Sequence, residues 1–228
     1  MILNGRACVV TGGFGVLGRA VVARLVGAGA TVAVVDHADG VSAEGAALGI
    51  GRVDLSDPAQ AEAAIGRAAF ELGGLYALVN VAGGFRWETL ADGDLSTWDR
   101  MYAMNVKTAA AASRAALPHL LAGGRGRIVS VAAYGALKAA AGMGAYAASK
   151  AGVIKLTEAL SEEVKAKGIT VNAVLPTILD TQANRKDMPD ADPDRWVKPE
   201  DLAEVIAFLL SDGARAITGA AIPVTGLV

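Results

Sequence analysis

The sequence is poor in the residues that form disulfides and metal sites. Its 228 residues include one cysteine, Cys8, and two histidines, His37 and His119. A single cysteine excludes an internal disulfide. Two histidines far apart in the chain, without a local acidic cluster, give no pattern of metal-ligand spacing. We therefore expect no disulfide framework and no metal site.

The chain also lacks long blocks of one residue class. Lysines and arginines are scattered among acidic residues, and the formal net charge is −2, which gives no sign of a nucleic-acid-binding patch. Lysines, arginines and glycines interrupt the apolar runs before they reach the roughly 20 residues of a membrane span. The first residues, MILNGRACVV, lack a basic leader and a cleavage site. We expect a cytoplasmic protein that binds neither nucleic acid nor membranes.

Small and apolar residues are abundant instead, with 28 glycines and 53% hydrophobic residues. Short β-branched runs alternate with segments of helical spacing, which is typical of a parallel sheet covered on both faces. The sequence predicts an α/β fold, with a doubly wound sheet of about seven strands in one domain over 1–228 and ligands at the carboxyl ends of the strands. The expected strands are 6–10, 31–36, 52–55, 76–83, 127–133, 169–176 and 220–224.

A glycine-rich turn, TGGFGVLG, lies between the first expected strand and a helix expected over 16–29. Gly12 permits a tight turn, Gly15 lets the backbone approach a pyrophosphate, and Gly18 lets the helix pack closely on the sheet. The free N–H groups of the helix N-terminus suit the phosphates. The alternative is a purely structural turn. The residues of this turn expected to bind a cofactor are Gly12, Phe14, Gly15, Val16 and Leu17.

The second expected strand ends at Asp36. A carboxylate at this position accepts hydrogen bonds from the ribose hydroxyls of a dinucleotide and repels a 2′-phosphate. His37 follows it, and no arginine lies among the eight residues of the glycine turn. This pattern favours NAD over NADP as cofactor. The alternative is an aspartate that only begins a turn.

Tyr146 and Lys150 in the stretch YAASK lie four residues apart, on one face of an expected helix. A free tyrosine titrates near 10, too high for efficient proton transfer at neutral pH. We expect the ammonium of Lys150 to lower the pKa of Tyr146 and to bind the nicotinamide ribose. The alternative is an accidental pair on an exposed helix.

These motifs occur together in a recognisable order: TGGFGVLG, VDL, NVAG, NV, YAASK and LPTILDT. In this set and order the sequence resembles the short-chain dehydrogenase/reductase family over nearly its whole length. The resemblance implies a Rossmann-type fold in which Tyr146 is the general acid or base. It also implies that Asn105 holds a water in a proton relay to Lys150. The further cofactor contacts that it implies are Asp54, Leu55, Asn80, Ala82, Gly83, Pro176, Ile178 and Thr181.

Two segments complete the interpretation. The polar stretch 180–196 carries two prolines near the expected carboxyl edge of the sheet, and we expect a substrate lid there. The helices expected over 99–121 and 146–167 are rich in alanine. The family resemblance implies a homodimer or homotetramer formed through these two helices.

The sequence departs from the family at Ala133, thirteen residues before Tyr146, where most members have a serine that binds the substrate carbonyl. Losing such a donor costs on the order of a hundredfold in rate. Tyr134 and Ser130 are nearby, but strand alternation points both away from the face of Ala133. The sequence is similar to one branch of the family, the dihydropteridine reductases, which also lack this serine. A smaller departure concerns the glycine turn. Its middle glycine, Gly15, lies one residue earlier than in the commonest form of the family.

We therefore expect an NAD(H)-dependent oxidoreductase that transfers a hydride between nicotinamide and a small carbonyl or alcohol, imine or quinonoid substrate. The missing serine at Ala133 leaves open a non-catalytic dinucleotide-binding sensor or scaffold. A third possibility is an NADPH-dependent carbonyl reductase of the 3-oxoacyl type.

Overall fold

The computed structural model describes residues 1–40 and 43–228, and within them the strands form one parallel sheet. The sheet order is β3-β2-β1-β4-β5-β6-β7, so the chain winds outward from β1 in both directions. This confirms the doubly wound α/β prediction. The strands are β1 (Ala7–Thr11), β2 (Thr31–Val35), β3 (Leu48–Ile50), β4 (Ala77–Asn80), β5 (Gly126–Val131), β6 (Ile169–Pro176) and β7 (Ala221–Val224).

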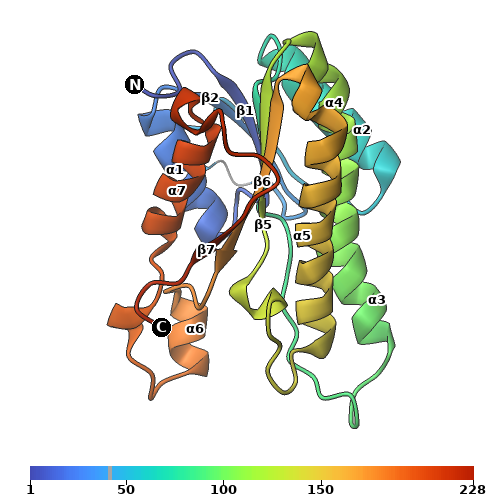
Figure 1. Ribbon diagram of the computed structural model, residues 1–228, viewed down its shortest axis with the longest axis vertical. Helices are drawn as coiled ribbons and strands as arrows, with labels where there is room; N and C mark the ends of the chain where they lie inside the picture. The colour runs from blue at the N-terminus through green and yellow to red at the C-terminus, as the bar shows by residue number, and fades with distance from the viewer. Residues whose placement is uncertain (41–42) are drawn as a thin grey trace.

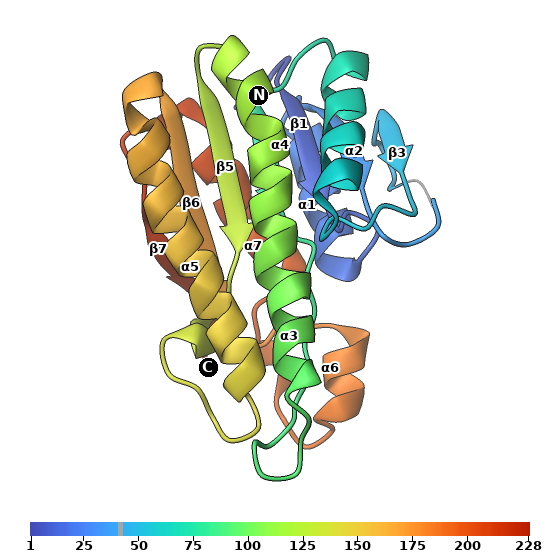
Figure 2. The ribbon, with the colours of Figure 1, turned by 90° about the vertical axis from the view of Figure 1, so that its right-hand side faces the viewer.

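Helices cover both faces of the sheet (Figure 1). Helices α1 and α7 lie on one face, while α2, α4 and α5 lie on the other (Figures 1 and 2). The helices are α1 (Val16–Gly27), α2 (Pro58–Glu71), α3 (Ser96–Tyr102), α4 (Thr108–Ala122), α5 (Gly144–Val164), α6 (Gln182–Asp187) and α7 (Pro199–Leu210). Among the described residues, none of these helices is both long and apolar enough to cross a bilayer.

The central strands are buried on both faces because consecutive side chains enter two different cores. Val10 of β1 packs with the α1 and α7 side, while its neighbour Val9 packs with the α2 and α4 side. Every residue of β4, β5 and β6 is buried. The near-continuous apolar runs in the sequence therefore reflect a sheet with no water-facing side.

The third strand was predicted wrongly. It spans Leu48–Ile50 and pairs with β2, whereas the expected 52–55 segment forms a loop. Arg52 adopts φ +60°, a left-handed conformation that interrupts an extended strand. Asp54 then folds back to accept hydrogen bonds from the backbone and side chain of Ser56. Asp57 caps α2 by accepting hydrogen bonds from the N–H groups of Ala59 and Gln60 in its first turn.

The helix expected over 99–121 is divided in the structure. Helix α3 ends at Tyr102, a π-helical segment follows over Ala103–Lys107, and α4 begins at Thr108. Such a wide turn rotates the side chains that follow it, and it is often found at functional sites. Asn105 lies in this segment and is buried beneath the carboxyl edge of the sheet.

Gly18 fixes how closely α1 approaches the first strand. A Cβ atom at this position would lie 2.1 Å from the carbonyl oxygen of Gly12 and 2.6 Å from the Cα of Gly13. Both neighbours are backbone atoms in the glycine turn. The absence of a side chain at Gly18 thus permits the helix to begin directly behind the turn, as the sequence predicted.

We predict that Gly18→Ala lowers the free energy of unfolding by about 3 kcal/mol, because the methyl group forces α1 away from the turn. The matched control is Gly27→Ala at the exposed end of the same helix, where an added Cβ meets nothing within 4 Å. Urea unfolding should show the control as stable as the parent chain or slightly more stable. Equal effects of the two substitutions would contradict the close packing.

Candidate functional site

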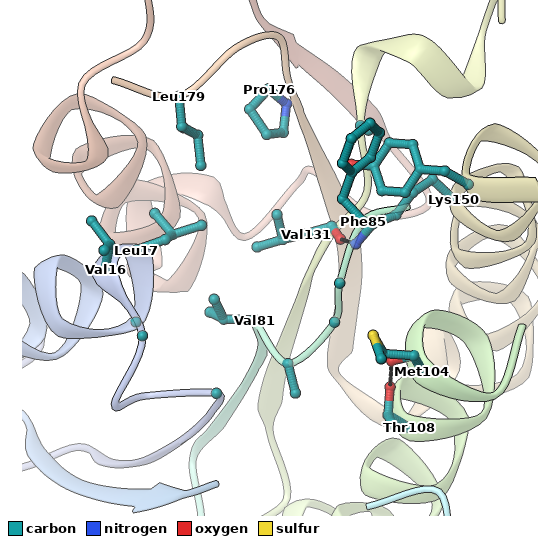
Figure 3. A pocket seen from close by; sticks show the side chains of 18 of the residues that line it. Val16, Leu17, Val81, Phe85, Met104, Thr108, Val131, Lys150, Pro176 and Leu179 are labelled. Carbon is teal, nitrogen blue, oxygen red and sulfur yellow. Dashed lines mark hydrogen bonds between the residues drawn. The ribbon is translucent and has the colours of Figure 1, made fainter. Parts of the chain in front are cut away.

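A cleft of about 1550 Å³ lies at the carboxyl edge of the sheet. Val16 and Leu17 line one end of it, while Phe85 and Lys150 lie at the other (Figure 3). Between them lie Val81, which follows β4, and Val131, the last residue of β5 (Figure 3). The cleft is therefore long enough to bring the glycine turn and the Tyr146–Lys150 helix to one site.

The glycine turn forms the floor at the first end of the cleft. Gly12 has φ +67°, and a Cβ there would lie 2.7 Å from the backbone nitrogen of Ala82. Gly15 begins α1 without any side-chain cap, and no acidic residue lies in the first turn of that helix. A twelve-residue helix thus presents uncapped N–H groups and its positive dipole end to the cleft.

Asp36 ties the glycine turn to the end of β2. Its carboxylate accepts a 2.9 Å hydrogen bond from the backbone N–H of Phe14 and another of 2.9 Å from that of Ala38. Asp36 is partly exposed and lines the cleft. The predicted ribose-binding residue therefore also holds the loop that precedes α1.

Asp54 and Leu55 line the same end of the cleft, from the loop that was expected to be a strand. The Ser56 hydroxyl and the Ser56 backbone N–H hold the pKa of Asp54 below its usual range. Leu55 is buried, whereas Asp54 is exposed. The loop thus offers an apolar wall beside a carboxylate that remains ionised.

These features fit a dinucleotide. The uncapped start of α1 can accept a pyrophosphate, since its N–H groups have no side-chain partner. Asp36 offers carboxylate oxygens beside it, and the cleft continues to Lys150. The described residues contain no cluster of three or more histidines, cysteines or acidic residues that could hold a metal.

Tyr146 and Lys150 lie at the second end of the cleft, on the first turns of α5. The Lys150 Nζ donates a 2.8 Å hydrogen bond to the Val131 carbonyl (Figure 3) and lies 6.0 Å from the centre of the Tyr146 ring. The Phe85 ring packs edge-on against Tyr146, with 4.9 Å between the ring centres. The predicted pair is therefore brought together beside an aromatic cover.

The predicted lowering of the tyrosine pKa is wrong for this structure. Burial raises the pKa of Tyr146 to about 12, and burial lowers the pKa of Lys150 to about 8. Lys150 is fully inside the protein and its Nζ is directed at the Val131 carbonyl, so its attraction to the phenolate does not outweigh desolvation. Each group is thus shifted toward its neutral form.

Three of the predicted site residues do not line the cleft. Asn80 is buried and donates to the hydroxyls of Ser113 and Ser130. Thr181 caps α6 by accepting a hydrogen bond from the Asn184 N–H. Asn80 thus fixes the end of β4, and Thr181 fixes the start of α6, whose Asn184 lines the cleft.

Asn105 is the third of these residues. Its side chain donates 3.1 Å and 2.9 Å hydrogen bonds to the Gly84 carbonyl and the Ser149 hydroxyl, and it accepts one from the Gly84 N–H. A Cβ on Gly83 would lie 2.5 Å from the Asn105 Oδ1. Asn105 therefore clamps the turn after β4 against the helix that carries Tyr146 and Lys150.

The position of the missing serine is filled by buried Ala133. Ser130 is buried on β5, where its hydroxyl accepts a hydrogen bond from Asn80, and it does not line the cleft. Strand β5 ends at Val131, and a 3₁₀ turn over Tyr134–Ala136 brings Tyr134 to the cleft wall. Strand alternation does not continue beyond Val131, because the backbone turns there.

The rim of the cleft is largely apolar. Phe85 and Trp87 line the cleft. The Trp87 indole donates to the Ala141 carbonyl, which joins the turn after β4 to the loop before α5. Rim residues that no sequence signal marked are Arg100, Met104, Met143, Leu179 and Met188. They come from separate loops and helices, so only the fold brings them together.

We predict a pH dependence of stability that originates at Lys150. Its pKa falls from about 10.5 in the unfolded chain to about 8 in the fold, so between these values the unfolded state binds more protons and stability rises with pH. Relative to Lys150→Met, the parent chain should gain about 2 kcal/mol of unfolding free energy from pH 7 to 10. Urea unfolding at each pH measures this difference.

The comparison with Lys150→Met cancels the contributions of other groups, including Tyr146, whose raised pKa reduces stability above pH 10. Lys155→Met, an exposed position on the same helix, is the control and should run parallel to the parent chain. If the unfolding free energy of Lys150→Met changed with pH in the same way as that of the parent chain, the proposed burial of the Lys150 amine would be contradicted.

The chain is similar to proteins that are named as dehydrogenases. The chain is 33% identical over 247 residues to 2-(S)-hydroxypropyl-CoM dehydrogenase 3 of Xanthobacter autotrophicus, covering 98% of this chain and 96% of that one. It is 38% identical over 219 residues to the inactive 2-(S)-hydroxypropyl-CoM dehydrogenase 2 of the same organism, covering 87% and 95%.

A solved structure and a family model agree with these relatives. A short chain dehydrogenase from Burkholderia cenocepacia, in complex with NADP, superposes with a TM-score of 0.89 at 36% identity and covers 99% of this chain and 98% of its own. The family model described as short chain dehydrogenase matches residues 6–192. The chain therefore belongs to the short-chain dehydrogenase/reductase family of oxidoreductases, which bind a nicotinamide dinucleotide.

Proposed function

We propose that this protein is an NAD(H)-dependent oxidoreductase in which Tyr146 transfers the proton and Lys150 assists it. The observation that carries the proposal is the placement of this pair in the same cleft as the uncapped start of α1. A bound nicotinamide cofactor supplies hydride chemistry, which no amino-acid side chain provides. The residues of the chain then have to bind, orient and protonate.

Tyr146 suits the role of proton donor in the reducing direction. Burial keeps its phenol protonated, since the pKa lies near 12 without a cofactor. Tyr146 lines the cleft, and a ligand reaches it when the Phe85 ring moves or packs against that ligand. Lys150 is held by the Val131 carbonyl close behind the tyrosine ring, where its charge stabilises a phenolate that forms on proton transfer.

The cofactor preference rests on the charges near Asp36. Its carboxylate is held at the cleft by two backbone N–H groups and disfavours a 2′-phosphate. Two arginines lie near this loop: Arg52 forms an ion pair with Asp39, and Arg19 donates a 2.8 Å hydrogen bond to the Phe14 carbonyl. The Burkholderia relative was crystallised with NADP, so the preference for NAD is a property that we assign to this chain and not to the family.

Tyr134 is the residue that we propose as substitute for the missing serine. It lines the cleft beside Ala133, the residue is 43% exposed, and its hydroxyl has no hydrogen-bond partner in the described part of the chain. A phenol can donate to a substrate carbonyl as a serine hydroxyl does. Substrates that accept hydride readily, such as imines or quinonoid rings, would need this donor less. The resemblance to the dihydropteridine reductases stays a prediction.

The rim suggests a substrate with a substantial apolar part. Phe85, Trp87 and Met143 surround the end of the cleft that holds Tyr146. The segment 180–196, which we propose as a lid, contributes Met188 from beyond α6. Arg185 pairs with Asp180 through two hydrogen bonds at the start of this segment, so its charge is engaged away from a substrate.

A non-catalytic dinucleotide sensor is the second candidate. It is favoured by Ala133, by the Phe85 ring against Tyr146, and by the relative whose name includes the word inactive. Loss of chemistry would remove the need for a buried amine behind Tyr146, yet Lys150 remains there despite its desolvation. We therefore favour the enzyme.

We also propose that copies of this chain form a homo-oligomer. Members of this family commonly form oligomers. Helices α4 and α5 lie side by side on one face of the molecule (Figure 2), and both are rich in alanine. Small side chains allow helices of two copies to approach closely. We infer that a homodimer or homotetramer forms through this face.

We predict that Tyr146→Phe lowers turnover at least ~100-fold while NADH still binds, because the substitution removes only the transferable proton. A panel of aldehydes, ketones, imines and quinones is assayed with NADH by absorbance, and NADH binding is measured by calorimetry. A sensor would show tight NADH binding and no turnover by the parent chain, which would overturn the proposal.

Tyr134→Phe provides the matched hydroxyl deletion at the rim. If Tyr134 replaces the serine, turnover of ketones should fall by about tenfold or more, with a smaller effect on quinones. An unchanged rate on every substrate would show that Tyr134 is not the donor.

A further inference from the structure

Three arginines gather at the opposite edge of the sheet, away from the cleft. Arg6 precedes β1, and Arg125 and Arg127 lie before and within β5. These strands flank β4, with Ala77 of β4 paired both to Cys8 and to Arg127. The amino ends of β1 and β5 are at the top of the sheet in Figure 2. Register therefore brings side chains from three adjacent strands to one place.

Tyr76, just before β4, is the centre of this group. The guanidinium carbons of Arg6, Arg127 and Arg125 lie 4.2, 5.6 and 6.0 Å from the centre of its ring. The Tyr76 hydroxyl donates to the Leu210 carbonyl at the end of α7. The ring is thus fixed by its hydroxyl and serves as a platform on which guanidinium groups converge.

The positive charge of this cluster is not balanced by the protein. Asp212 is the acidic group within it, 3.1 Å from Arg6 and 3.7 Å from Arg127. Three guanidinium groups and one carboxylate leave an excess of two positive charges. The same four residues are the charged groups that act on the Tyr76 phenol, whose pKa burial raises. Arg215 donates to the Asp212 backbone carbonyl but is not among the groups that act on Tyr76, so it stands outside this cluster.

One hydrogen-bond donor of Arg127 lacks an acceptor in the described part of the chain. Its side chain is about 5% exposed, and its Nε has no partner among the described residues. Its Nη1 donates to the Gly126 carbonyl, while its distance to Asp212 exceeds that of a hydrogen bond. A buried guanidinium with a free N–H is costly unless an acceptor binds it.

From these contacts we infer that the cluster of Arg6, Arg125 and Arg127 around Tyr76 is a binding site for a phosphate group. An excess of two charges matches a dianion, and planar guanidinium groups suit the oxygens of phosphate. The Arg125 side chain is exposed, with no ion pair or hydrogen bond in the described chain, and is free to close over the ligand. The site lies at the amino edge of the sheet and needs none of the cleft residues.

The test is calorimetric titration of inorganic phosphate into NADH-saturated protein at constant ionic strength, so that the glycine turn does not contribute. The parent chain should bind phosphate with a dissociation constant near or below the millimolar range. Arg125→Gln should weaken binding about tenfold, and Asp212→Asn should strengthen it severalfold, because that substitution removes a competing anion.

Arg114→Gln on α4 is the matched control, since it removes the same charge from an exposed side chain outside the cluster. It should leave phosphate binding unchanged. Absence of binding at 10 mM phosphate would overturn the inference, as would equal losses in Arg114→Gln and Arg125→Gln. If NADH itself does not bind, the difference between the two arginine variants still decides this site independently of the proposed function.

Discussion

The close approach of backbone segments at the glycine turn is the constraint on which the candidate site depends. Gly12 touches the turn after β4, and Gly18 touches the Gly12 carbonyl, so neither position has room for a side chain. Asp36 then fastens the turn through the Phe14 N–H. Because these contacts are made by backbone atoms, α1 begins at one fixed place, with its free N–H groups facing the cleft.

The second half of the site depends on burial. Lys150 lies inside the protein, and its Nζ donates a hydrogen bond to the Val131 carbonyl. Desolvation moves the pKa of this amine down and that of Tyr146 up, so neither group favours its charged form before a ligand enters. A ligand that brings hydroxyl groups to Lys150 and displaces Phe85 would change both environments. Asn105 keeps the adjacent turn in place through Gly84 and Ser149.

Much of this arrangement could be predicted from the sequence, because it depends on local patterns. Apolar runs gave six of the strands, and glycine spacing placed the turn before α1. The third strand was missed because the RVDL segment has strand composition, while the left-handed Arg52 and the Asp54 turn exclude it from the sheet. Strand alternation likewise gave no warning of the 3₁₀ turn that brings Tyr134 to the cleft.

Features made by several distant segments could not be predicted. The methionine and aromatic rim combines loops after three strands, and the arginine cluster needs the register of β1, β4 and β5. The pKa of Tyr146 was expected to fall because only its charged neighbour is visible in the sequence, whereas burial becomes known with the fold. Sequence thus predicts which groups meet more reliably than it predicts their environment.

The most direct measurement of the central claim compares the affinities of NADH and NADPH for the same protein by calorimetry. The uncapped α1 terminus predicts that a dinucleotide binds, and Asp36 predicts that NADH binds at least ~10-fold more tightly than NADPH. Equal affinities, or tighter binding of NADPH, would contradict the role assigned to Asp36. Failure of both dinucleotides to bind would contradict the account of the cleft itself.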